Sequence, residues 1–401
     1  MKSSKVSTFS QVLLWFGAAV SIAEILTGAL IAPLGLEKGI LAILTGHIIG
    51  AIILFLAGYI GAKSELSSAS TARISFGKYG SYGFSVLNLL QLLGWTSIMI
   101  IMAAKSMNGI TKTLWNFSNE WIFCLFIGLL ICLWIFLGNK NLTKLNTVVM
   151  FLLFAFSIVL GFVVFTKTST GYQVYQAITP MSFGEAVELN VAMCLSWLPL
   201  ISDYTRNLKK PVSGTIGSVA GYFFGSMLMY IIGLGAALYA GTSDISEILL
   251  SAGLGIIALV IVVLSTVTTT FLDVYSAGVS IENLNKKANE KTGALVVCIL
   301  GTLLAIFVPM SQYENFLYLI GSAFAPLFAI LFSEYYFFGK KDASSNINIK
   351  NIILWAIGFA GYRFLMPYAT FTGITLPVMT GVAILHVLSN LVKQQSGKSG
   401  A

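Results

Sequence analysis

Charged side chains are scarce in this chain of 401 residues, in which Asp, Glu, Lys and Arg together make up 9%. Soluble domains carry about 25% charged residues, so this chain cannot cover a water-exposed surface in the usual way. Hydrophobic residues make up 57% of the chain, and the mean hydropathy is +0.88. We therefore expect a protein that is solvated by membrane lipid, with its backbone groups hydrogen-bonded inside the segments that cross the bilayer.

Signatures of enzyme chemistry are also missing. The sequence contains no H-E-x-x-H zinc motif, no G-x-S-x-G nucleophile elbow and no Gly-rich phosphate or dinucleotide loop. Its four cysteines have neither metal-site nor disulfide spacing. We therefore expect no enzyme activity, no cofactor and no ATP-driven motor. The two histidines, His47 and His386, are interpreted as hydrogen-bonding partners between helices.

Apolar runs of about 20 residues, without the alternation of a membrane β-strand, predict α-helices that cross the bilayer. The first run is longer than the apolar core of a signal peptide, so it is expected to remain as a span. The sequence predicts twelve spans, at residues 11–32, 40–62, 80–107, 120–138, 145–166, 188–206, 213–240, 253–281, 292–309, 316–337, 351–369 and 372–393.

Lys and Arg are distributed unequally between the loops of this arrangement. If the N-terminus is inside, 18 of the 23 basic residues fall on the cytoplasmic side. The positive-inside rule then predicts a multi-pass protein of the cytoplasmic (inner) membrane, with both termini inside. The pI near 9.2 reflects this topology and not a nucleic-acid partner, because the basic residues are spread over short loops. The basic residues expected outside are Lys38, Lys105, Lys112, Lys167 and Arg363.

Two of the predicted spans are poor candidates for a continuous helix. The first contains Ser21 and is followed directly by Pro33, and the sixth contains Ser196, Trp197 and Pro199. Proline removes a backbone hydrogen bond and clashes with the preceding turn. Interrupted helices in corresponding positions indicate a binding site at mid-membrane, where freed carbonyl groups meet ions and substrate. The two spans are five apart, so a repeat of spans 1–5 in spans 6–10 would be inverted.

Two carboxylates and two tryptophans lie deep inside predicted spans. A carboxylate at the bilayer centre costs about 2.5–3.5 kcal/mol. Glu24 and Asp273 are therefore expected to be protonated, hydrogen-bonded or reserved for a substrate or proton. Tryptophan normally favours the membrane interfaces. Trp95 and Trp197 lie near the middle of spans, where each indole either packs in the core or stacks on a flat ring.

Three consecutive threonines, 268–270, lie in the eighth span. They either bond to carbonyl groups of their own helix or supply oxygen ligands to sodium, a hard cation. Many helices without catalytic chemistry favour a secondary transporter. A channel would need a filter, which the sequence does not show. An amino-acid carrier and a non-transporting scaffold or sensor remain as alternatives.

Several short motifs occur in a consistent order along the chain. They are GYIGAKSELSSASTARISFGKYGS, Leu-Gly-Trp, Ser-Asp-Tyr-Thr-Arg, TTTFLDVYSAG and Ser-Glu-Tyr, at residues 58–81, 93–95, 202–206, 268–278 and 333–335. They resemble motifs of the nucleobase–cation symporters, the cytosine permease family, and the likeness covers roughly residues 10–395. The resemblance implies an all-α membrane protein with the LeuT-type five-plus-five inverted repeat and two extra helices. It also implies import of a flat nitrogen heterocycle, coupled to sodium or protons.

The resemblance assigns roles to individual residues. Trp95 matches the family's ring-stacking tryptophan, and Ser196 and Trp197 fall in its substrate-facing stretch. A candidate sodium site follows in the same way, from the carbonyl groups of Gly17 and Val20 and the hydroxyl groups of Thr268 and Thr269.

The chain departs from the cytosine branch of the family in the third span. That branch has a glutamine three residues before its tryptophan, where this chain has Leu92, and Gln91 lies one residue earlier. One residue corresponds to about 100° of helix rotation. The sequence therefore leaves open whether Gln91 faces the site.

A second departure lies in the eighth span. Thr270 and Leu272 replace asparagines of the cytosine branch, and Asp273 follows. Together with Glu24, this pattern resembles the branch assigned to hydroxymethylpyrimidine, the thiamin precursor. A carboxylate can pair with both the exocyclic N–H and the protonated ring nitrogen of an aminopyrimidine. We expect import of hydroxymethylpyrimidine, with cytosine or another nucleobase as the alternative, and a substrate site made of Trp95, Gln91, Ser196, Trp197, Asp273 and Glu24.

The expected organisation follows from these assignments. The protein is expected to act as a monomer, with lipid and a small heterocycle as its partners and no nucleic acid. Its segments are a cytoplasmic N-terminus (1–10), a first repeat (11–166), a second repeat (167–338), two further helices (339–393) and a solvated C-terminal tail (394–401).

Overall fold

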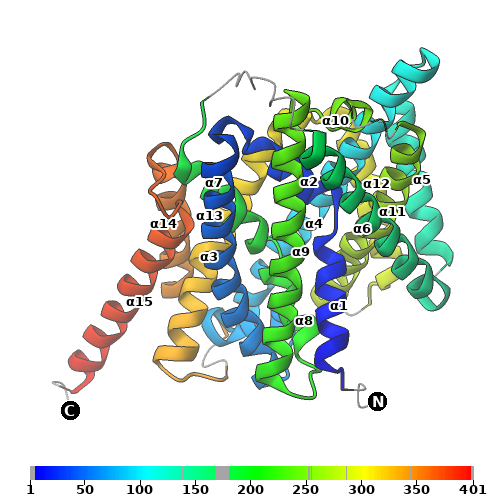
Figure 1. Cartoon of the computed structure of the whole chain (residues 1–401). Helices are drawn as coiled ribbons and strands as arrows, with labels where there is room; N and C mark the ends of the chain where they lie inside the picture. Colours follow the sequence, from blue (N-terminus) through cyan, green and yellow to red (C-terminus); the bar gives the residue numbers. More distant parts are fainter. Residues whose placement is uncertain are drawn as a thin grey trace.

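The fold is a bundle of helices, seen from the side in Figure 1. The computed structural model describes residues 5–137, 139–167, 180–251, 253, 255–285, 287–342 and 346–398. In chain order the α-helices are α1 (Thr8–Ala19), α2 (Ile22–Leu30), α3 (Gly35–Ser64), α4 (Ser68–Trp115), α5 (Glu120–Leu137), α6 (Asn139–Lys167), α7 (Phe183–Leu195), α8 (Leu198–Thr205), α9 (Pro211–Ala240), α10 (Ile245–Ser251), α11 (Gly255–Leu284), α12 (Glu290–Phe307), α13 (Tyr313–Phe332), α14 (Ile349–Leu365) and α15 (Thr375–Lys398).

Each of the twelve predicted spans coincides with one of these helices or with a pair of them. Within the described residues, ten helical segments are long and apolar enough to cross a membrane, so the count of twelve crossings stays a prediction. The sequence did not predict the short helix α10 or the first part of α4.

The first predicted span is broken near its middle, into α1 and α2. The backbone of Ser21 is extended, with φ −142° and ψ 157°, and its Oγ accepts a hydrogen bond from the N–H of Glu24 at 3.3 Å. Ser21 is thus the N-cap that starts α2. Pro33, which the sequence also indicated as a disruption, lies beyond α2 in a 3-10 turn (Ala32–Leu34).

The sixth predicted span is broken in the same way, into α7 and α8. Trp197 lies between the two helices, and Pro199 occupies the first turn of α8. Proline is favoured there because the first backbone N–H groups of a helix have no partner within the helix. The predicted interruption of both spans is confirmed.

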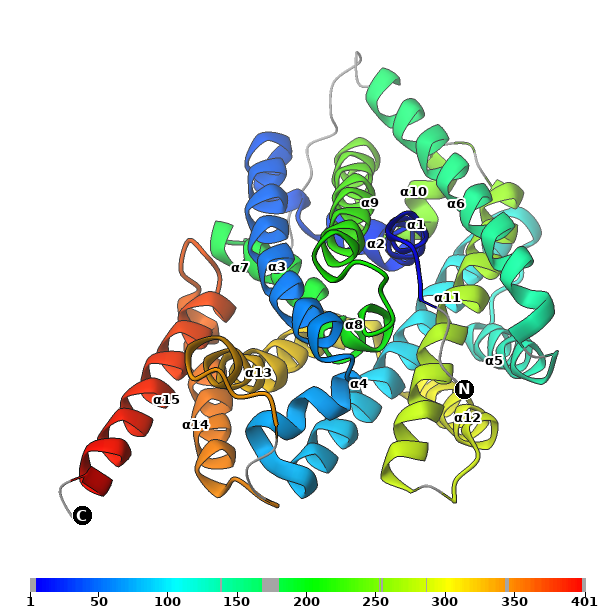
Figure 2. The same ribbon diagram turned by 90° about the horizontal axis from the view of Figure 1, so that it is seen from below.

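Helix contacts follow a paired pattern. α1 packs on α9 as α7 packs on α3, and α5 packs on α11 as α12 packs on α4. Exchanging spans 1–5 with spans 6–10 maps each of these contacts onto its partner, which is what the predicted inverted repeat requires. The repeat boundaries at 11–166 and 167–338 stay predictions. α14 and α15 lie at one edge of the bundle beside α13 (Figure 2).

Close packing of α9 on α1 depends on a stripe of glycines at a spacing of four residues: Gly217, Gly221 and Gly225. A Cβ added at Gly221 would lie 2.4 Å from a backbone oxygen of α1. Gly46 and Gly50 serve the contact between α3 and α7, and a Cβ added at Gly46 would lie 2.7 Å from a backbone oxygen of α7. Small residues at this spacing let two helix backbones approach closely.

The motifs of residues 58–81 and 202–206 contact each other at one end of the bundle. The N–H of Ser68 donates to the Asp203 carboxylate at 3.1 Å, and the Ser68 hydroxyl accepts from the N–H of Ser202 at 3.1 Å. Gly77, with φ 80°, interrupts α4 after its first turns. This positive φ favours glycine, so the motif's glycine permits the sharp turn toward the rest of α4.

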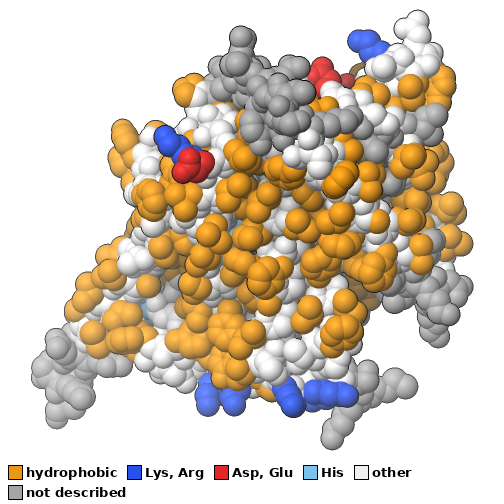
Figure 3. All heavy atoms as spheres, in the orientation of Figure 1, with side chains coloured by type: hydrophobic (Ala, Val, Ile, Leu, Met, Phe, Trp, Pro, Cys, Tyr) orange, Lys and Arg blue, Asp and Glu red, His pale blue; other side chains and the backbone are white. Residues whose placement is uncertain are grey.

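Charge is distributed unequally between the two ends of the molecule. The first residues of α1 and the end of α15 lie at the same end (Figure 1). On the face shown in Figure 3, apolar side chains cover the middle, and Lys and Arg side chains gather at that end. This asymmetry is consistent with the predicted orientation, which the structure by itself does not test.

Candidate functional site

A narrow cavity lies where the two helix breaks meet α4 and α11. Its volume is about 40 Å³, whereas one buried water needs about 10–15 Å³. Met99 and Met193 lie in its wall, and these flexible side chains can move to admit a larger guest. The structure brings together at this cavity all six residues that the sequence predicted for substrate: Trp95, Gln91, Ser196, Trp197, Asp273 and Glu24.

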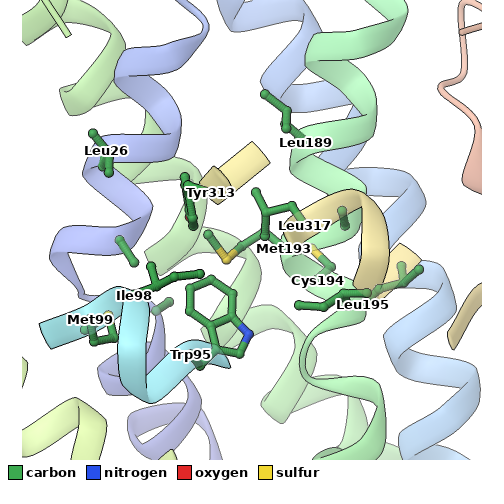
Figure 4. Close-up of a cluster of buried hydrophobic side chains, with 14 of the residues drawn as sticks. Leu26, Trp95, Ile98, Met99, Leu189, Met193, Cys194, Leu195, Tyr313 and Leu317 are labelled. Atoms are coloured by element: carbon green, nitrogen blue, oxygen red, sulfur yellow. The ribbon is translucent and has the colours of Figure 1, made fainter. Parts of the chain in front are cut away.

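The Trp95 indole is held by aromatic edges. It makes T-shaped contacts with Phe316 at 5.5 Å and with Tyr313 at 6.1 Å between ring centroids. Gly94 makes room for this packing, because a Cβ there would lie 2.2 Å from the Phe316 ring. Figure 4 shows Trp95 in a hydrophobic cluster with Met193 and Tyr313. The indole is therefore fixed in orientation while it lines the cavity.

The second indole, Trp197, is held from the opposite wall. Its ring lies 5.4 Å from Trp15 and 6.0 Å from Tyr222, with T-shaped geometry in both contacts. Trp15 is itself fixed by a hydrogen bond from its indole N–H to the side chain of Gln11 at 3.1 Å. Residues of α1 and α9 thus position the side chain at the α7–α8 break.

Gln91 lies in the cavity wall, which answers the question that the sequence left open. Its Nε2 donates to the backbone carbonyl of Ser196 at 2.7 Å and to Asn88 Oδ1 at 3.3 Å. The Ser196 carbonyl is available because α7 ends at the preceding residue. The Gln91 Oε1 is buried and has no hydrogen-bond partner among the described residues. It is therefore a free acceptor beside the cavity.

Asp273 also enters the cavity wall without a partner. It extends from α11 and is half-buried. Within the part of the chain that the structure describes, its carboxylate makes no hydrogen bond and no ion pair. Burial without partners is costly for a carboxylate, so this side chain has unused capacity to bind a donor.

Glu24 is more buried than Asp273, at 3% exposure, and both of its oxygens have partners. The Tyr222 hydroxyl donates to Oε1 at 2.9 Å, and the Ser226 hydroxyl lies 2.8 Å from Oε2. The same Ser226 oxygen lies 2.7 Å from Nε2 of His47, whose Nδ1 lies 2.9 Å from the Ile43 carbonyl. His47 therefore bonds between helices, as the sequence predicted, but the sequence did not connect it with Glu24.

The four residues of the candidate sodium site all line a second cavity, which has a volume of about 610 Å³ and lies between α1, α6 and α11. Among the described residues, no hydrogen bond reaches the carbonyl oxygen of Gly17 or Val20. The hydroxyl of Thr268 donates to carbonyl groups of its own helix at 3.0 Å, which is the alternative that the sequence raised. Its oxygen lone pairs stay available, and Thr269 lines both this second cavity and the central cavity.

Two further buried glutamates were missed at the sequence level. Glu188 is fully buried and Glu334 is 1% exposed. The signal for the first was the capping box at Ser182 and Glu185, because it starts the helix at Phe183 and so places Glu188 well inside it. Glu334 was marked only as a member of the Ser-Glu-Tyr motif, and its partners come from later in the sequence.

Glu334 belongs to the Ser-Glu-Tyr motif and anchors the end of α13. Its carboxylate forms an ion pair with Lys340 at 2.5 Å, lies 3.2 Å from Nε2 of His386 and accepts from Asn351 at 3.1 Å. Asn351 also donates to a backbone carbonyl in α4 at 2.8 Å. The predicted hydrogen bond between helices for His386 is confirmed, and this motif connects the second half of the chain to the motif of residues 58–81.

Comparison with known proteins gives a consistent result. A family model described as "permease for cytosine/purines, uracil, thiamine, allantoin" matches residues 2–386. The cytosine permease of Escherichia coli K12 is 25% identical over an alignment of 409 positions, gaps included. The alignment covers 96% of this chain and 93% of that protein. The hydantoin permease of Microbacterium maritypicum is 22% identical over 366 residues, which cover 84% of this chain and 74% of the permease.

Solved structures share the fold. Mhp1, a nucleobase-cation-symport-1 family transporter solved in a closed conformation with bromovinylhydantoin bound, aligns with a TM-score of 0.79 at 19% identity, over 98% of this chain and 94% of Mhp1. A Na⁺-coupled sialic acid symporter aligns with a TM-score of 0.68 at 13% identity, over 96% of this chain and 90% of that symporter. The chain thus has the Mhp1, or LeuT-type, fold, and its relatives are permeases and not enzymes.

Proposed function

Because the chain belongs to the family of permeases for cytosine and purines, uracil, thiamine and allantoin, we propose that it imports an amino-substituted pyrimidine by symport with a cation. Hydroxymethylpyrimidine is the first candidate substrate, and cytosine is the alternative. The observation that carries this proposal is the pair of unpartnered acceptors, Gln91 Oε1 and the Asp273 carboxylate, in the wall of a cavity that is also lined by Trp95.

Free acceptors in the wall favour a substrate that presents N–H donors. An exocyclic amine offers two N–H groups, and a ring nitrogen beside it offers a third when it is protonated. A carboxylate that pairs with such an edge forms charge-assisted hydrogen bonds, which are about twice as strong as neutral ones. An analogue without the amine would leave buried acceptors unpaired, which sites of this kind reject strongly.

The choice between the two pyrimidines depends on the donors that the wall offers. Cytosine carries a ring carbonyl and needs a donor for it, whereas hydroxymethylpyrimidine has no ring carbonyl. The Nε2 of Gln91 is committed to the Ser196 carbonyl, and the Ser196 hydroxyl donates to the carbonyl of Ala192 at 3.2 Å. These two groups are not free to bind a ring carbonyl, which supports hydroxymethylpyrimidine as the first candidate. The hydroxyl of Thr269, which also lines the cavity, is the donor that cytosine would use.

Ligand binding to the purified protein in detergent tests the proposal. We expect hydroxymethylpyrimidine to raise the melting temperature and to bind more tightly than cytosine, uracil or adenine. Trp95→Ala should weaken binding by about 5- to 150-fold, because stacking of a base on an aromatic ring contributes about 1–3 kcal/mol. The matched control is Trp121→Ala, since that indole lies on the exposed side of α5. A folded protein that binds no pyrimidine or purine would contradict the proposal.

Coupling to a cation requires a separate measurement. The unpartnered carbonyl oxygens of Gly17 and Val20, with the hydroxyls of Thr268 and Thr269, support sodium as one coupling ion. Sodium should then tighten substrate binding relative to potassium at fixed pH, because the two ligands stabilise the same state. Equal affinity in the two salts would remove the sodium site from the proposal. Uptake into proteoliposomes distinguishes a transporter from a scaffold or sensor.

A further inference from the structure

Glu24, Ser226 and His47 form a continuous hydrogen-bonded chain across α2, α9 and α3. We infer that these three hydrogen-bonded side chains form a proton-binding site, and that its proton enters the cell together with the substrate. The inference rests on the proposed import function and adds the identity of a coupling ion and the groups that carry it.

His47 forms the end of the hydrogen-bonded series that lies away from the cavity. Nδ1 of His47 lies 2.9 Å from the backbone carbonyl of Ile43. A carbonyl oxygen only accepts hydrogen bonds, so Nδ1 must carry a hydrogen. In a neutral imidazole Nε2 is then an acceptor, and the Ser226 hydroxyl, 2.7 Å away, must donate to it.

The single hydroxyl hydrogen of Ser226 decides the protonation of the other end. If it points to His47, the contact of 2.8 Å between Ser226 Oγ and Glu24 Oε2 needs a hydrogen on the carboxyl group. If it points to Glu24, the hydrogen between Ser226 and His47 must come from Nε2, and the imidazole carries two. Both arrangements contain one proton more than a neutral histidine together with a carboxylate.

Loss of that proton breaks a hydrogen bond and leaves a net charge. With a neutral His47 and an ionised Glu24, one of the three contacts joins two lone pairs. The three side chains together are neutral with the proton and carry one negative charge without it. An uncompensated charge inside the membrane is costly, and Glu24 is 3% exposed and His47 1%. The loaded state is therefore favoured until a conformational change opens a path to water.

Among the residues that the structure describes, no permanent counter-charge faces Glu24, Ser226 or His47. Within the described residues, neither Glu24 nor His47 forms an ion pair with Lys or Arg. The titratable groups that face Glu24 and His47 are three neutral hydroxyls and one thiol, those of Tyr222, Tyr230, Tyr313 and Cys194. Asp273 lines the same cavity as Glu24. A proton is therefore the ligand that neutralises Glu24.

Glu24 also connects the proton with the substrate. Its side chain lines the central cavity, while His47 lies behind it and does not. A proton taken from water on the outer side can be held on Glu24, Ser226 and His47 beside a bound substrate. It can then be released to water on the cytoplasmic side. Binding of one ligand then changes the affinity for the other, which is the condition for coupled transport.

The test uses the full-length protein in proteoliposomes, in sodium-free buffer with the membrane potential clamped. The probe is radiolabelled hydroxymethylpyrimidine, or cytosine if only cytosine binds, together with a pH-sensitive dye inside the vesicles. We expect internal acidification that starts on substrate addition, with one proton per substrate. An inward proton gradient should drive accumulation of up to about tenfold per pH unit.

Two variants test whether the proton is held by the hydrogen-bonded side chains of Glu24, Ser226 and His47. We expect His47→Gln to lower the ratio of protons to substrate at least several-fold, and a ratio does not depend on how much of the variant folds. The matched control is Ser218→Ala, which removes a buried hydroxyl two turns earlier on α9 that donates to Gln11 and to its own helix. Its ratio should equal that of the wild type. If His47→Gln is not recovered, the wild-type proton flux decides alone.

The possible results are distinguishable. Substrate uptake by the wild type without proton movement would overturn the inference and leave the proposed function intact. A His47→Gln ratio equal to that of the wild type would also overturn it, because the proton would then be held elsewhere. Absence of both binding and uptake of pyrimidines in the wild type would refute the proposed function, and the inference would fall with it.

Discussion

Three buried carboxylates and the half-buried Asp273 differ in how many partners they have. Glu188 accepts four hydrogen bonds, and Glu334 has an ion pair and two further partners. Glu24 has two hydroxyl partners, and Asp273 has none among the described residues. A fully partnered carboxylate fixes a structure, whereas one that lacks partners has capacity for a ligand. This ordering supports the roles that we propose for Glu24 and Asp273.

The unpartnered carboxylate gives a prediction about substrate choice. Asp273→Asn should weaken binding of an aminopyrimidine by about tenfold or more, because hydrogen bonds to charged groups contribute about 1.5–3 kcal/mol. It should weaken uracil less, since the new amide can donate to a ring carbonyl. Competition binding on the purified protein measures both affinities. The control is Asp342→Asn, at an exposed position.

A parallel loss for both ligands would contradict this role of Asp273, because a general disturbance of the cavity lowers both affinities alike. The comparison between the two pyrimidines is therefore more informative than either affinity alone.

Individual site residues were predictable where their chemistry conflicts with the membrane. Trp95, Trp197, Glu24 and Asp273 were marked by their depth in apolar runs, and all four line one cavity. The hydrogen-bond partners of these residues were not predictable in the same way. Ser226 lies 202 residues from Glu24 in the chain, so nothing local in the sequence indicates that their side chains meet.

At the scale of elements, Glu188 joins α7 to the start of α15. Its carboxylate accepts from the N–H groups of Ile374 and Thr375 at 2.6 and 2.8 Å, from the Thr375 hydroxyl at 2.6 Å, and from the Tyr362 hydroxyl. These donors fill the acceptor sites of both oxygens. The helix N-terminus adds its favourable dipole. One side chain thus connects an interrupted helix of the core to α14 and α15.

We predict that Glu188→Gln lowers the melting temperature of the purified protein clearly. The Gln amide would place donor hydrogens against donors, and each unsatisfied buried group costs about 1–3 kcal/mol. The matched control, Glu185→Gln, lies one turn earlier in an exposed capping box, where glutamine serves as well as glutamate. Thermal unfolding in detergent, followed by loss of monodisperse protein, provides the measurement. Equal melting temperatures for the two variants would contradict the anchoring role.

The sequence predicted that two helices are interrupted, but it located one interruption imperfectly. In span 6 the break lies beside Pro199, as expected from the missing N–H of proline. In span 1 it lies at Val20 and Ser21, where serine caps a new helix, and Pro33 comes only after that helix has ended. A capping serine and a serine inside a helix look the same in a sequence, so tertiary packing decides between them.

On the scale of the whole molecule, the motifs that carry the family likeness lie mostly away from the cavity. Ser68 and Asp203 bind each other near one end of the bundle, and Glu334 and Asn351 form a second contact there. The sequence could predict the fold class through these motifs because they hold helices from both halves together. The residues that we propose for substrate choice, Gln91 and Asp273, line the cavity, and Asp273 belongs to the motif of residues 268–278.

The orientation of the bundle is the remaining prediction at this scale. Lys209 must lie at the end of the bundle where the chain begins, because its N–H donates to the carbonyl of Val6 at 3.0 Å. Lys112 lies near the other end of α4, which starts at the end where Lys209 lies. The positive-inside rule puts the end with Lys209 in the cytoplasm.

Single-cysteine labelling with a membrane-impermeant maleimide distinguishes the two orientations. We expect Lys112→Cys to react in intact cells and Lys209→Cys to react only after permeabilisation. Three of the four native cysteines are buried and the fourth, Cys132, is half-buried, so background labelling should be low. Reaction of Lys209→Cys alone in intact cells would show that the orientation is the reverse of the predicted one. The labelling result decides the topology alone, because the direction of symport follows the ion gradient in either orientation.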